Sequence, residues 1–299
     1  MTERFLQLGA SLYVPATRSD LVALGTSKKY PFLRSIILCT EDAVAERELP
    51  QALANVEQLL RRLEAGELLR FVRVRSPGVL RTILQMDGVD RLDGFVLPKV
   101  TRANLDDYFD ALHAADRFDV MLTLETMETF NACEMARLRD VLLQEPLRRR
   151  ILSLRIGGND LFHLLGMRRP RRGTIYQTPL AVTIAQLVTT FRPHGFNLTA
   201  PVFEYLDSPR ALRREVRRDL SQGLFGKTAI HPRQVAAIES QYRVSARDLH
   251  TAERILSDSA PPVFRLHGAM CEIATHRRWA SLIHERARLY GVTGSLKTS

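Results

Sequence analysis

Residues 151–160 read Ile-Leu-Ser-Leu-Arg-Ile-Gly-Gly-Asn-Asp, a short and mainly apolar run that ends in two glycines and an acid. Six residues are too few for a typical helix, and a nearly continuous apolar run is typical of a strand buried on both faces, as in a parallel sheet. Similar runs recur along the chain. Eight are found, at residues 12–14, 35–39, 69–74, 94–97, 119–124, 151–156, 197–200 and 223–229.

Longer amphipathic stretches separate these runs and are typical of helices, for example at residues 101–115, 127–143, 179–191 and 208–221. Strict alternation of strand and helix favours a closed (β/α)8 TIM barrel over an open doubly wound sheet. We therefore expect a TIM-barrel domain at residues 1–256. A C-terminal helical extension and tail are expected at residues 257–299.

The composition fits one large domain, because the 299 residues are 45% hydrophobic and 25% charged. No stretch approaches the roughly 20 apolar residues of a membrane span. The first ten residues lack the layout of a secretion signal, so we expect a cytoplasmic protein without a membrane partner. The cysteines Cys39, Cys133 and Cys271 have no paired spacing and indicate neither a disulfide framework nor a zinc site.

The net charge of +10 comes from 43 basic and 33 acidic residues, with arginines gathered at residues 148–150, 168–172 and 213–218. Such clusters can bind phosphate, carboxylate or nucleic acid. Acids interleave with the arginines at residues 213–219, which is more typical of a solvated helix face. No nucleic-acid-binding motif accompanies them, and we do not expect a nucleic-acid partner.

Charged side chains follow most of the predicted strands, where the chemistry of a barrel collects. They are Glu41, Asp42, Arg73, Arg75, Lys99, Glu125, Asp160, Lys227 and His231. Glu125 and Asp160 follow neighbouring strands and can give two ligands to a Mg²⁺ ion that keeps water and substrate oxygens in its other positions. The alternatives for Asp160 are the N-cap of a helix and a surface salt bridge.

A metal chelated by a 2-oxo acid acts as a Lewis acid and stabilises the enolate formed when a neighbouring carbon–carbon bond breaks. Arg73 can pair with the substrate carboxylate through two hydrogen bonds. Gly158 belongs to a glycine pair that lets backbone approach a ligand closely, although such glycines often serve turn geometry alone.

Seven short motifs follow one another in an order that is specific as a set. They are LYVPATR (12–18), TEDAV (40–44), VRV (72–74), LPKV (97–100), LET (124–126), GGNDL (157–161) and FGKTAIHP (225–232). In this order the chain resembles the citrate lyase beta-subunit-like family, within the group of aldolases and malyl- and citramalyl-coenzyme A lyases. It also resembles the divergent branch of that family that accompanies tellurium-resistance clusters.

The resemblance implies a Mg²⁺-dependent barrel in which Glu125 and Asp160 hold the metal and Arg73 binds the substrate. Glu41 or Asp42 would assist the reaction through water. Further substrate contacts would come from Arg18, Arg75, Lys99 and Gly158. The family has an asparagine where this chain has Arg75, and that exchange implies a more anionic or phosphorylated substrate.

A last matching segment, residues 268–272, is similar to a C-terminal motif whose carboxylate enters the active site of a neighbouring subunit in related coenzyme A lyases. Glu272 stands where that motif has aspartate, so the resemblance implies an acid or base role for Glu272 in a homo-oligomer, a trimer or a hexamer. Two other departures are Cys39 in place of an aspartate and Pro201 in place of an acid.

We therefore expect a Mg²⁺-dependent carbon–carbon lyase or aldolase that acts on a small anionic oxo-acid or its coenzyme A thioester. A hydrolase of an acyl thioester on the same scaffold is one alternative. The other is a barrel that binds a ligand as a regulatory component. The departures at Cys39 and Pro201 favour this last alternative, and the retained Arg73, Glu125 and Asp160 oppose it.

Overall fold

The computed structural model describes residues 4–112 and 117–295, and its centre is a sheet of eight parallel strands. In space the strands follow the order β7-β6-β5-β4-β3-β2-β1-β8. Their bounds are β1 Ala10–Pro15, β2 Ser35–Cys39, β3 Leu69–Arg73, β4 Gly94–Leu97, β5 Asp119–Leu124, β6 Ile151–Ile156, β7 Leu198–Thr199 and β8 Lys227–Ala229.

Two short contacts between the last two strands close the sheet. Ala200 bridges to Lys227, and the Phe225 amide donates to the Leu198 carbonyl at 3.0 Å. Since β8 also pairs with β1, the sheet returns to its starting strand. The (β/α)8 TIM barrel predicted from the sequence is confirmed.

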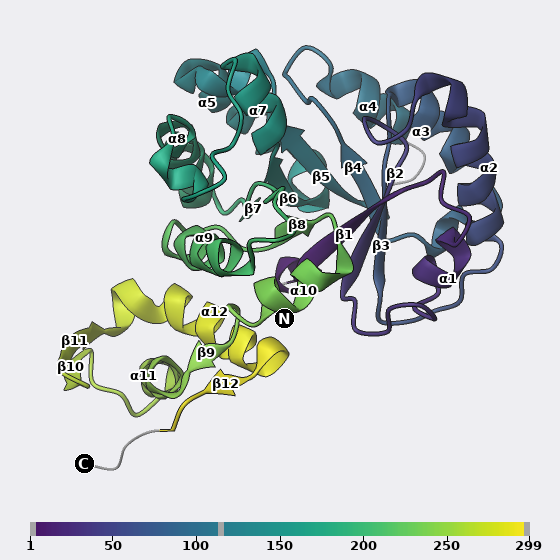
Figure 1. The fold of residues 1–299 in the computed structure, drawn as a ribbon. Coiled ribbons are helices and arrows are strands. Elements are labelled where there is room, and N and C mark those ends of the chain that lie inside the picture. Colours follow the sequence, from purple (N-terminus) through teal and green to yellow (C-terminus); the bar gives the residue numbers. More distant parts are fainter. Residues whose placement is uncertain (1–3, 113–116, 296–299) are drawn as a thin grey trace.

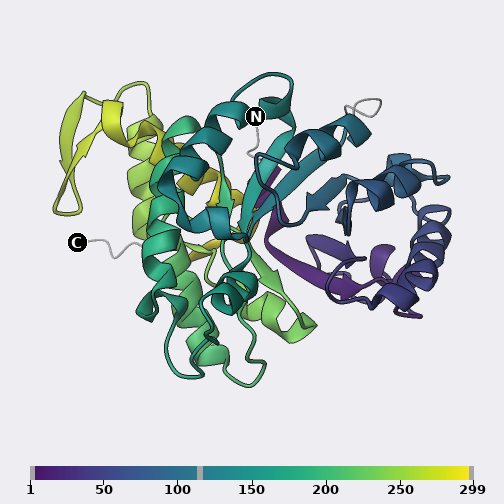
Figure 2. The same cartoon turned by 90° about the horizontal axis from the view of Figure 1, so that it is seen from above.

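Helices lie around the outside of the strands, as two views that differ by a 90° turn show (Figures 1 and 2). Their bounds are α1 Leu21–Gly25, α2 Leu49–Leu60, α3 Pro77–Leu84, α4 Leu105–Leu112, α5 Ala132–Leu142, α6 Leu147–Arg150, α7 Gly158–Leu164, α8 Leu180–Phe191, α9 Pro209–Ser221 and α10 Pro232–Glu239. Short 3-10 helices lie at Arg4–Leu8, Glu46–Glu48, Val89–Arg91, Met127–Phe130, Ile175–Gln177 and Arg192–His194.

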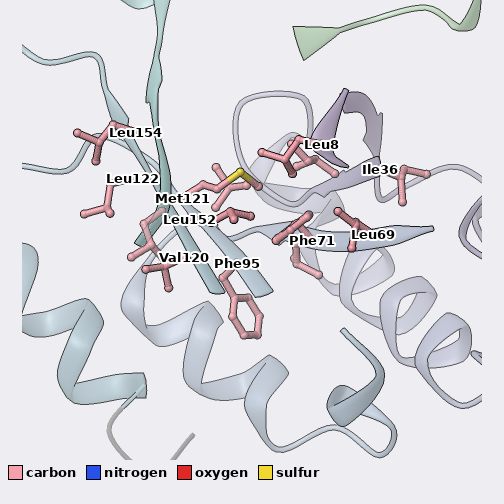
Figure 3. Packing of buried hydrophobic residues seen from close by; sticks show 14 of the residues in the cluster. Leu8, Ile36, Leu69, Phe71, Phe95, Val120, Met121, Leu122, Leu152 and Leu154 are labelled. Carbon is pink, nitrogen blue, oxygen red and sulfur yellow. The ribbon is translucent and has the colours of Figure 1, made fainter. Parts of the chain in front are cut away.

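Strands and helices meet in one large apolar core. Strand β2 is buried at every residue, as a strand covered on both faces requires. Phe71, Phe95 and Met121 come from three adjacent strands and fill the core beside Leu122 (Figure 3). This packing explains why nearly continuous apolar runs form the barrel wall.

The structure differs from the sequence prediction at the ends of some elements. The helix expected at residues 127–143 is divided, because the Asn131 side chain accepts hydrogen bonds from the amides of Cys133 and Glu134 and begins a new helix there. The last predicted strand is only Lys227–Ala229, because Gly223 and Gly226 adopt positive φ angles and form turns before it. Residues 113–115 of the predicted helix at 101–115 lie outside the described residues.

The C-terminal extension contains a small second core. Its elements are β9 Val244–Ser245, α11 Ala246–Leu256, β10 Val263–Leu266, β11 Ala269–Glu272, α12 Ile273–Tyr290 and β12 Val292–Thr293. Val244, Ile255, Cys271 and Ile283 are among the buried residues of this core. It therefore draws on residues on both sides of the boundary predicted at residue 256, and the division into two domains stays a prediction. Among the described residues, no helix is both long and apolar enough to cross a membrane.

Candidate active site

A cavity of about 580 Å³ opens at the carboxyl ends of the barrel strands. Its walls come from the ends of β1, β2, β3, β5, β6 and β8 and from the loop after β7. Asp42, Arg73, Glu125, Gly158 and Asp160 line it, five of the residues that the sequence predicts for the site. The other predicted residues lie beside this cavity or away from it.

Arg73 links three carboxylates at the end of β3. Its Nη2 atom lies 2.6 Å from Glu41 Oε2, 3.0 Å from Asp42 Oδ2 and 3.4 Å from Glu125 Oε1. Lys99 Nζ joins the same group from the end of β4, at 2.7 Å from Glu41 Oε1 and 3.0 Å from Asp42 Oδ1. Charge-assisted hydrogen bonds of this kind hold the side chains in one arrangement.

Glu125 is 4% exposed, and its burial raises the pKa of the carboxyl to about 7. The positive charge of Arg73 opposes this shift, whereas the negative charge of Asp160 adds to it. The amide of Lys99 donates to Glu125 Oε1 at 3.0 Å. To do so, Lys99 adopts a φ of 50°, which is uncommon for a residue with a side chain.

The acids Glu41 and Asp42 differ in their electrostatics although they share both cations. Burial raises the pKa of Glu41, which is 4% exposed. For Asp42, burial works in the same direction but is outweighed by hydrogen bonds with Glu41 and Lys99, so its pKa is lowered. Of the two carboxylates, Asp42 is therefore the more readily ionised, and it is the one that lines the cavity.

Asp160 lies in the first turn of α7 and faces the cavity. The cap position of this helix belongs to Gly157, so Asp160 is not the N-cap that was one alternative from the sequence. Its carboxylate makes no ion pair or side-chain hydrogen bond with residues 4–112 or 117–295. Its negative charge reaches Glu125, and two carboxylates that repel each other in this way are suited to a shared cation.

A magnesium ion fits this donor set. The described part of the chain holds no group of three or more acidic, histidine or cysteine side chains placed to bind a metal. Mg²⁺ does not need such a group, because one or two carboxylates commonly hold it. Its other coordination positions are filled by water and by oxygen atoms of the substrate. A cation held by both carboxylates would offset the repulsion between Glu125 and Asp160 and the raised pKa of Glu125.

Gly157 brings the backbone of β6 directly against Glu125. A Cβ atom on Gly157 would lie 2.1 Å from Glu125 Oε2, far inside van der Waals contact. We expect Gly157→Ala to displace Glu125 and to weaken Mg²⁺ binding by about 10-fold or more, as changes beside metal ligands do. Calorimetric titration of Mg²⁺ measures this effect.

The matched control for this substitution is Gly78→Ala in α3, where an added Cβ would meet only Ser76 Oγ at 3.6 Å. Its Mg²⁺ affinity is expected to equal that of the wild type. A folded Gly157→Ala protein with unchanged affinity would show that the contact between Gly157 and Glu125 has no role in metal binding.

The structure keeps three predicted residues out of the cavity. Arg75 donates to the carbonyl oxygens of Thr40 at 3.2 Å and Glu41 at 3.1 Å, so its guanidinium holds the loop after β2. Arg18 pairs with Asp20 at 2.7 Å. Glu272 lies in β11, on the extension that projects from the side of the barrel (Figure 1). Its carboxylate accepts a hydrogen bond from Thr275 at 3.0 Å.

Other cavity residues were missed from the sequence. Tyr13, Thr123, Arg155 and Thr228 line the cavity although each lies within a predicted strand. The available signal was a polar residue inside an otherwise buried run, and it is clearest for Arg155, the second-last residue of β6. Lys227 was expected near the strand ends, but it is fully buried between Glu215 and Asp219 and is absent from the cavity lining.

The fold and the cavity define an enzyme of the TIM-barrel class with its acidic and basic groups at the carboxyl ends of the strands. Residues 3–292 match the family described as C-C bond lyase of the TIM-barrel fold. The chain belongs to this family of carbon–carbon bond lyases. The resemblance to the citrate lyase beta-subunit-like group is thereby confirmed, whereas no finding tests the tellurium-resistance branch.

Two curated relatives and one solved structure show the range of similarity. A (3S)-malyl-CoA thioesterase of Cereibacter sphaeroides is 28% identical over 74% of this chain and 73% of its own length. An L-malyl-CoA/beta-methylmalyl-CoA lyase of Rhodobacter capsulatus is 25% identical over 74% of this chain and 76% of its own. The CitE protein of Mycobacterium tuberculosis, solved with magnesium, acetoacetate and coenzyme A, has a TM-score of 0.70 at 22% identity and covers 95% of this chain and 100% of its own.

Proposed function

We propose that this chain is a Mg²⁺-dependent lyase or aldolase for a small anionic oxo-acid or its coenzyme A thioester. The observation that carries the proposal is the placement of Glu125 and Asp160 beside Arg73 in one cavity. The malyl-CoA lyase among the relatives, and the magnesium and coenzyme A bound by the CitE protein, support the same chemistry. At the carbonyl oxygen of the substrate, Mg²⁺ would supply Lewis-acid polarisation.

Arg73 is the group that would orient the carboxylate of the substrate. Its Nε atom is buried and has no hydrogen-bond partner among the described residues, while Nη2 serves the three acids. A buried donor without a partner is costly, so an oxyanion beside Nε would satisfy it. Arg73 thereby fixes the orientation of the substrate relative to Glu125 and Asp160.

Proton transfer through water would fall to the pair of acids at the end of β2. Asp42 lines the cavity, and its lowered pKa keeps it ready to accept a hydrogen bond from water. Glu41 lies behind it, and the Asp42 amide donates to Glu41 Oε2 at 2.7 Å. Lys99 bridges both carboxylates, which makes it a positioning residue for the acids.

The raised pKa of Glu125 predicts that Mg²⁺ binding depends on pH. Near pH 6 the free protein holds a proton on a carboxyl whose pKa is about 7, and the cation must displace it. The affinity for Mg²⁺ should therefore fall about 10-fold between pH 8 and pH 6. Calorimetry in two buffers of different ionisation enthalpy would measure both the affinity and the proton released. Equal affinity at the two pH values, with no proton release, would contradict this role of Glu125.

A hydrolase of an acyl thioester is the second candidate, favoured by the similarity to a malyl-CoA thioesterase. Both activities would use the same cavity and differ in the bond that breaks. The products separate them, because a lyase gives two carbon fragments and a thioesterase gives the intact acid and free coenzyme A. A regulatory barrel would give neither set of products.

Glu272 retains its proposed role only in an oligomer. It lies on the extension and does not line the cavity of its own chain, so its carboxylate would act in the cavity of a neighbouring copy. A homo-oligomer, a trimer or a hexamer, therefore remains part of the proposal. A cytoplasmic location stays a prediction.

A further inference from the structure

A second arginine lies in the cavity, at the wall formed by β6. Arg155 is 3% exposed and lines the cavity together with Tyr13 and Thr228. Its Nη2 atom donates to Thr228 Oγ1 at 2.6 Å, and its Nη1 atom is 3.6 Å from Met121 Sδ. The guanidinium carbon lies 5.4 Å from the centre of the Tyr13 ring. The guanidinium of Arg155 therefore has a hydroxyl group, a thioether and the face of an aromatic ring as its neighbours.

The positive charge of Arg155 has no ionic partner in this environment. Within residues 4–112 and 117–295 no carboxylate lies within 4.0 Å of its guanidinium. Arg73, in the same cavity, contacts three carboxylates, and the buried Arg169 pairs with Glu215. An unpaired buried cation is costly, so a site that retains one is suited to an anion.

The neighbouring strand contributes a second unsatisfied group. Thr123 on β5 is paired in register with Arg155 and also lines the cavity. Its Oγ1 atom is buried and has no hydrogen-bond partner in the described part of the chain. A hydroxyl that can donate and a guanidinium with several N–H groups form a donor set suited to an oxyanion.

We propose that Arg155, assisted by the Thr123 hydroxyl, binds a second anionic group of the substrate and so selects oxo-acids that carry two anionic groups. This inference rests on the proposed function, in which Arg73 and the metal-binding side of the cavity receive the first carboxylate and the oxo group. Arg155 is then the residue that determines specificity. A dicarboxylic oxo-acid and an oxo-acid bearing a phosphonate or phosphate satisfy the same oxyanion chemistry.

Binding of three related acids tests the inference. Calorimetry in the presence of Mg²⁺ compares pyruvate, oxaloacetate and phosphonopyruvate, which share the oxo-acid group and differ in the second anion. The wild type is expected to bind oxaloacetate or phosphonopyruvate at least about 10-fold more tightly than pyruvate. The tighter of the two identifies the second anion as a carboxylate or a phosphoryl-type group.

Variants of the two residues provide the second half of the test. Arg155→Met should weaken binding of the dianionic acid about 10- to 100-fold and leave pyruvate within about 3-fold, because only the former reaches the guanidinium. Arg155→Lys should recover part of this loss. Thr123→Val, a variant of similar shape, should weaken only the dianionic acid. Arg137→Met removes one exposed arginine charge on α5 and should match the wild type.

Two sets of results would overturn the inference. In the first, the wild type binds pyruvate and both dianionic acids with equal affinity. In the second, folded Arg155 variants lose the same amount of affinity for all three acids. In either case Mg²⁺-dependent binding of pyruvate would leave the proposed function standing. The opposite result is that binding of none of the acids requires Mg²⁺. If succinate then binds the wild type but not Arg155→Met, the second anion site is supported and the metal-dependent function is refuted. Absence of binding by every acid contradicts both.

Discussion

Replacing Asp160 with alanine is expected to abolish Mg²⁺-dependent binding of an oxo-acid and with it the lyase activity. Asp160 faces the cavity, and no described residue pairs with its carboxylate. Glu125, the other predicted ligand, is engaged by Arg73 and the Lys99 amide. Loss of groups that only support metal ligands already costs about 10- to 100-fold in affinity, so loss of a ligand should cost at least about 100-fold.

Calorimetric titration of Mg²⁺ with and without pyruvate measures this effect, and Asp140→Ala is the control. Asp140 is an exposed acid on α5 that pairs with Arg139 outside the cavity, so its removal changes the net charge equally without touching the site. Mg²⁺ affinity in Asp160→Ala equal to that of the control would refute the assignment of Asp160. Thermal unfolding of both variants verifies that each is folded. Asp160 is half-buried and its carboxylate has no ion pair or side-chain hydrogen bond among the described residues, so its replacement should change the stability little.

Lys227→Met is expected to cause the largest loss of stability. Lys227 is fully buried, with its Nζ atom 3.0 Å from Glu215 Oε1 and 2.9 Å from Asp219 Oδ2. The same network includes Arg169 on Glu215 and the Tyr176 hydroxyl, which donates to Asp219 at 2.6 Å. Removing Lys227 leaves the buried Asp219 without its cation and Glu215 with Arg169 alone, and breaking a buried ion pair costs about 3–5 kcal/mol in the free energy of unfolding.

The matched control is Lys29→Met, which removes a lysine from an exposed pair with Asp20. Such surface pairs contribute less than about 1 kcal/mol. Urea unfolding of the two variants and the wild type gives the comparison. A Lys227→Met protein as stable as Lys29→Met would mean that the buried network does not stabilise the barrel.

The barrel could be predicted because its evidence is local and repeated. Each strand is a short apolar run buried on both faces, and β6 illustrates how such a run ends in glycines and an acid. Asp160 and Glu125 could be found in the same way, since polar residues after parallel strands meet at one end of a barrel. The end of the barrel that holds the cavity could therefore be predicted from the sequence alone.

Side-chain direction was the part that could not be predicted. Arg73 is the last residue of β3 and Arg75 follows two residues later. The guanidinium of Arg75 turns to backbone carbonyls, whereas Arg73 faces the cavity. Lys227 turns into a buried network formed with α9, the helix that directly precedes its strand. Arg155 lies within an otherwise apolar run, and its importance follows only from the absence of an ionic partner among the residues that the structure describes. These outcomes depend on side-chain contacts that the alternation of apolar and polar runs does not specify.

The most direct test of the central claim is an assay for carbon–carbon bond formation. Purified protein would be incubated with acetyl-coenzyme A and glyoxylate, pyruvate or oxaloacetate, with Mg²⁺ or with EDTA, and the thioesters would be measured by mass spectrometry. The account predicts a product whose mass is the sum of an oxo-acid and acetyl-coenzyme A, formed with Mg²⁺ and absent with EDTA or in Asp160→Ala. Mg²⁺-dependent binding of the oxo-acids without any such product, or with release of coenzyme A alone, would contradict it.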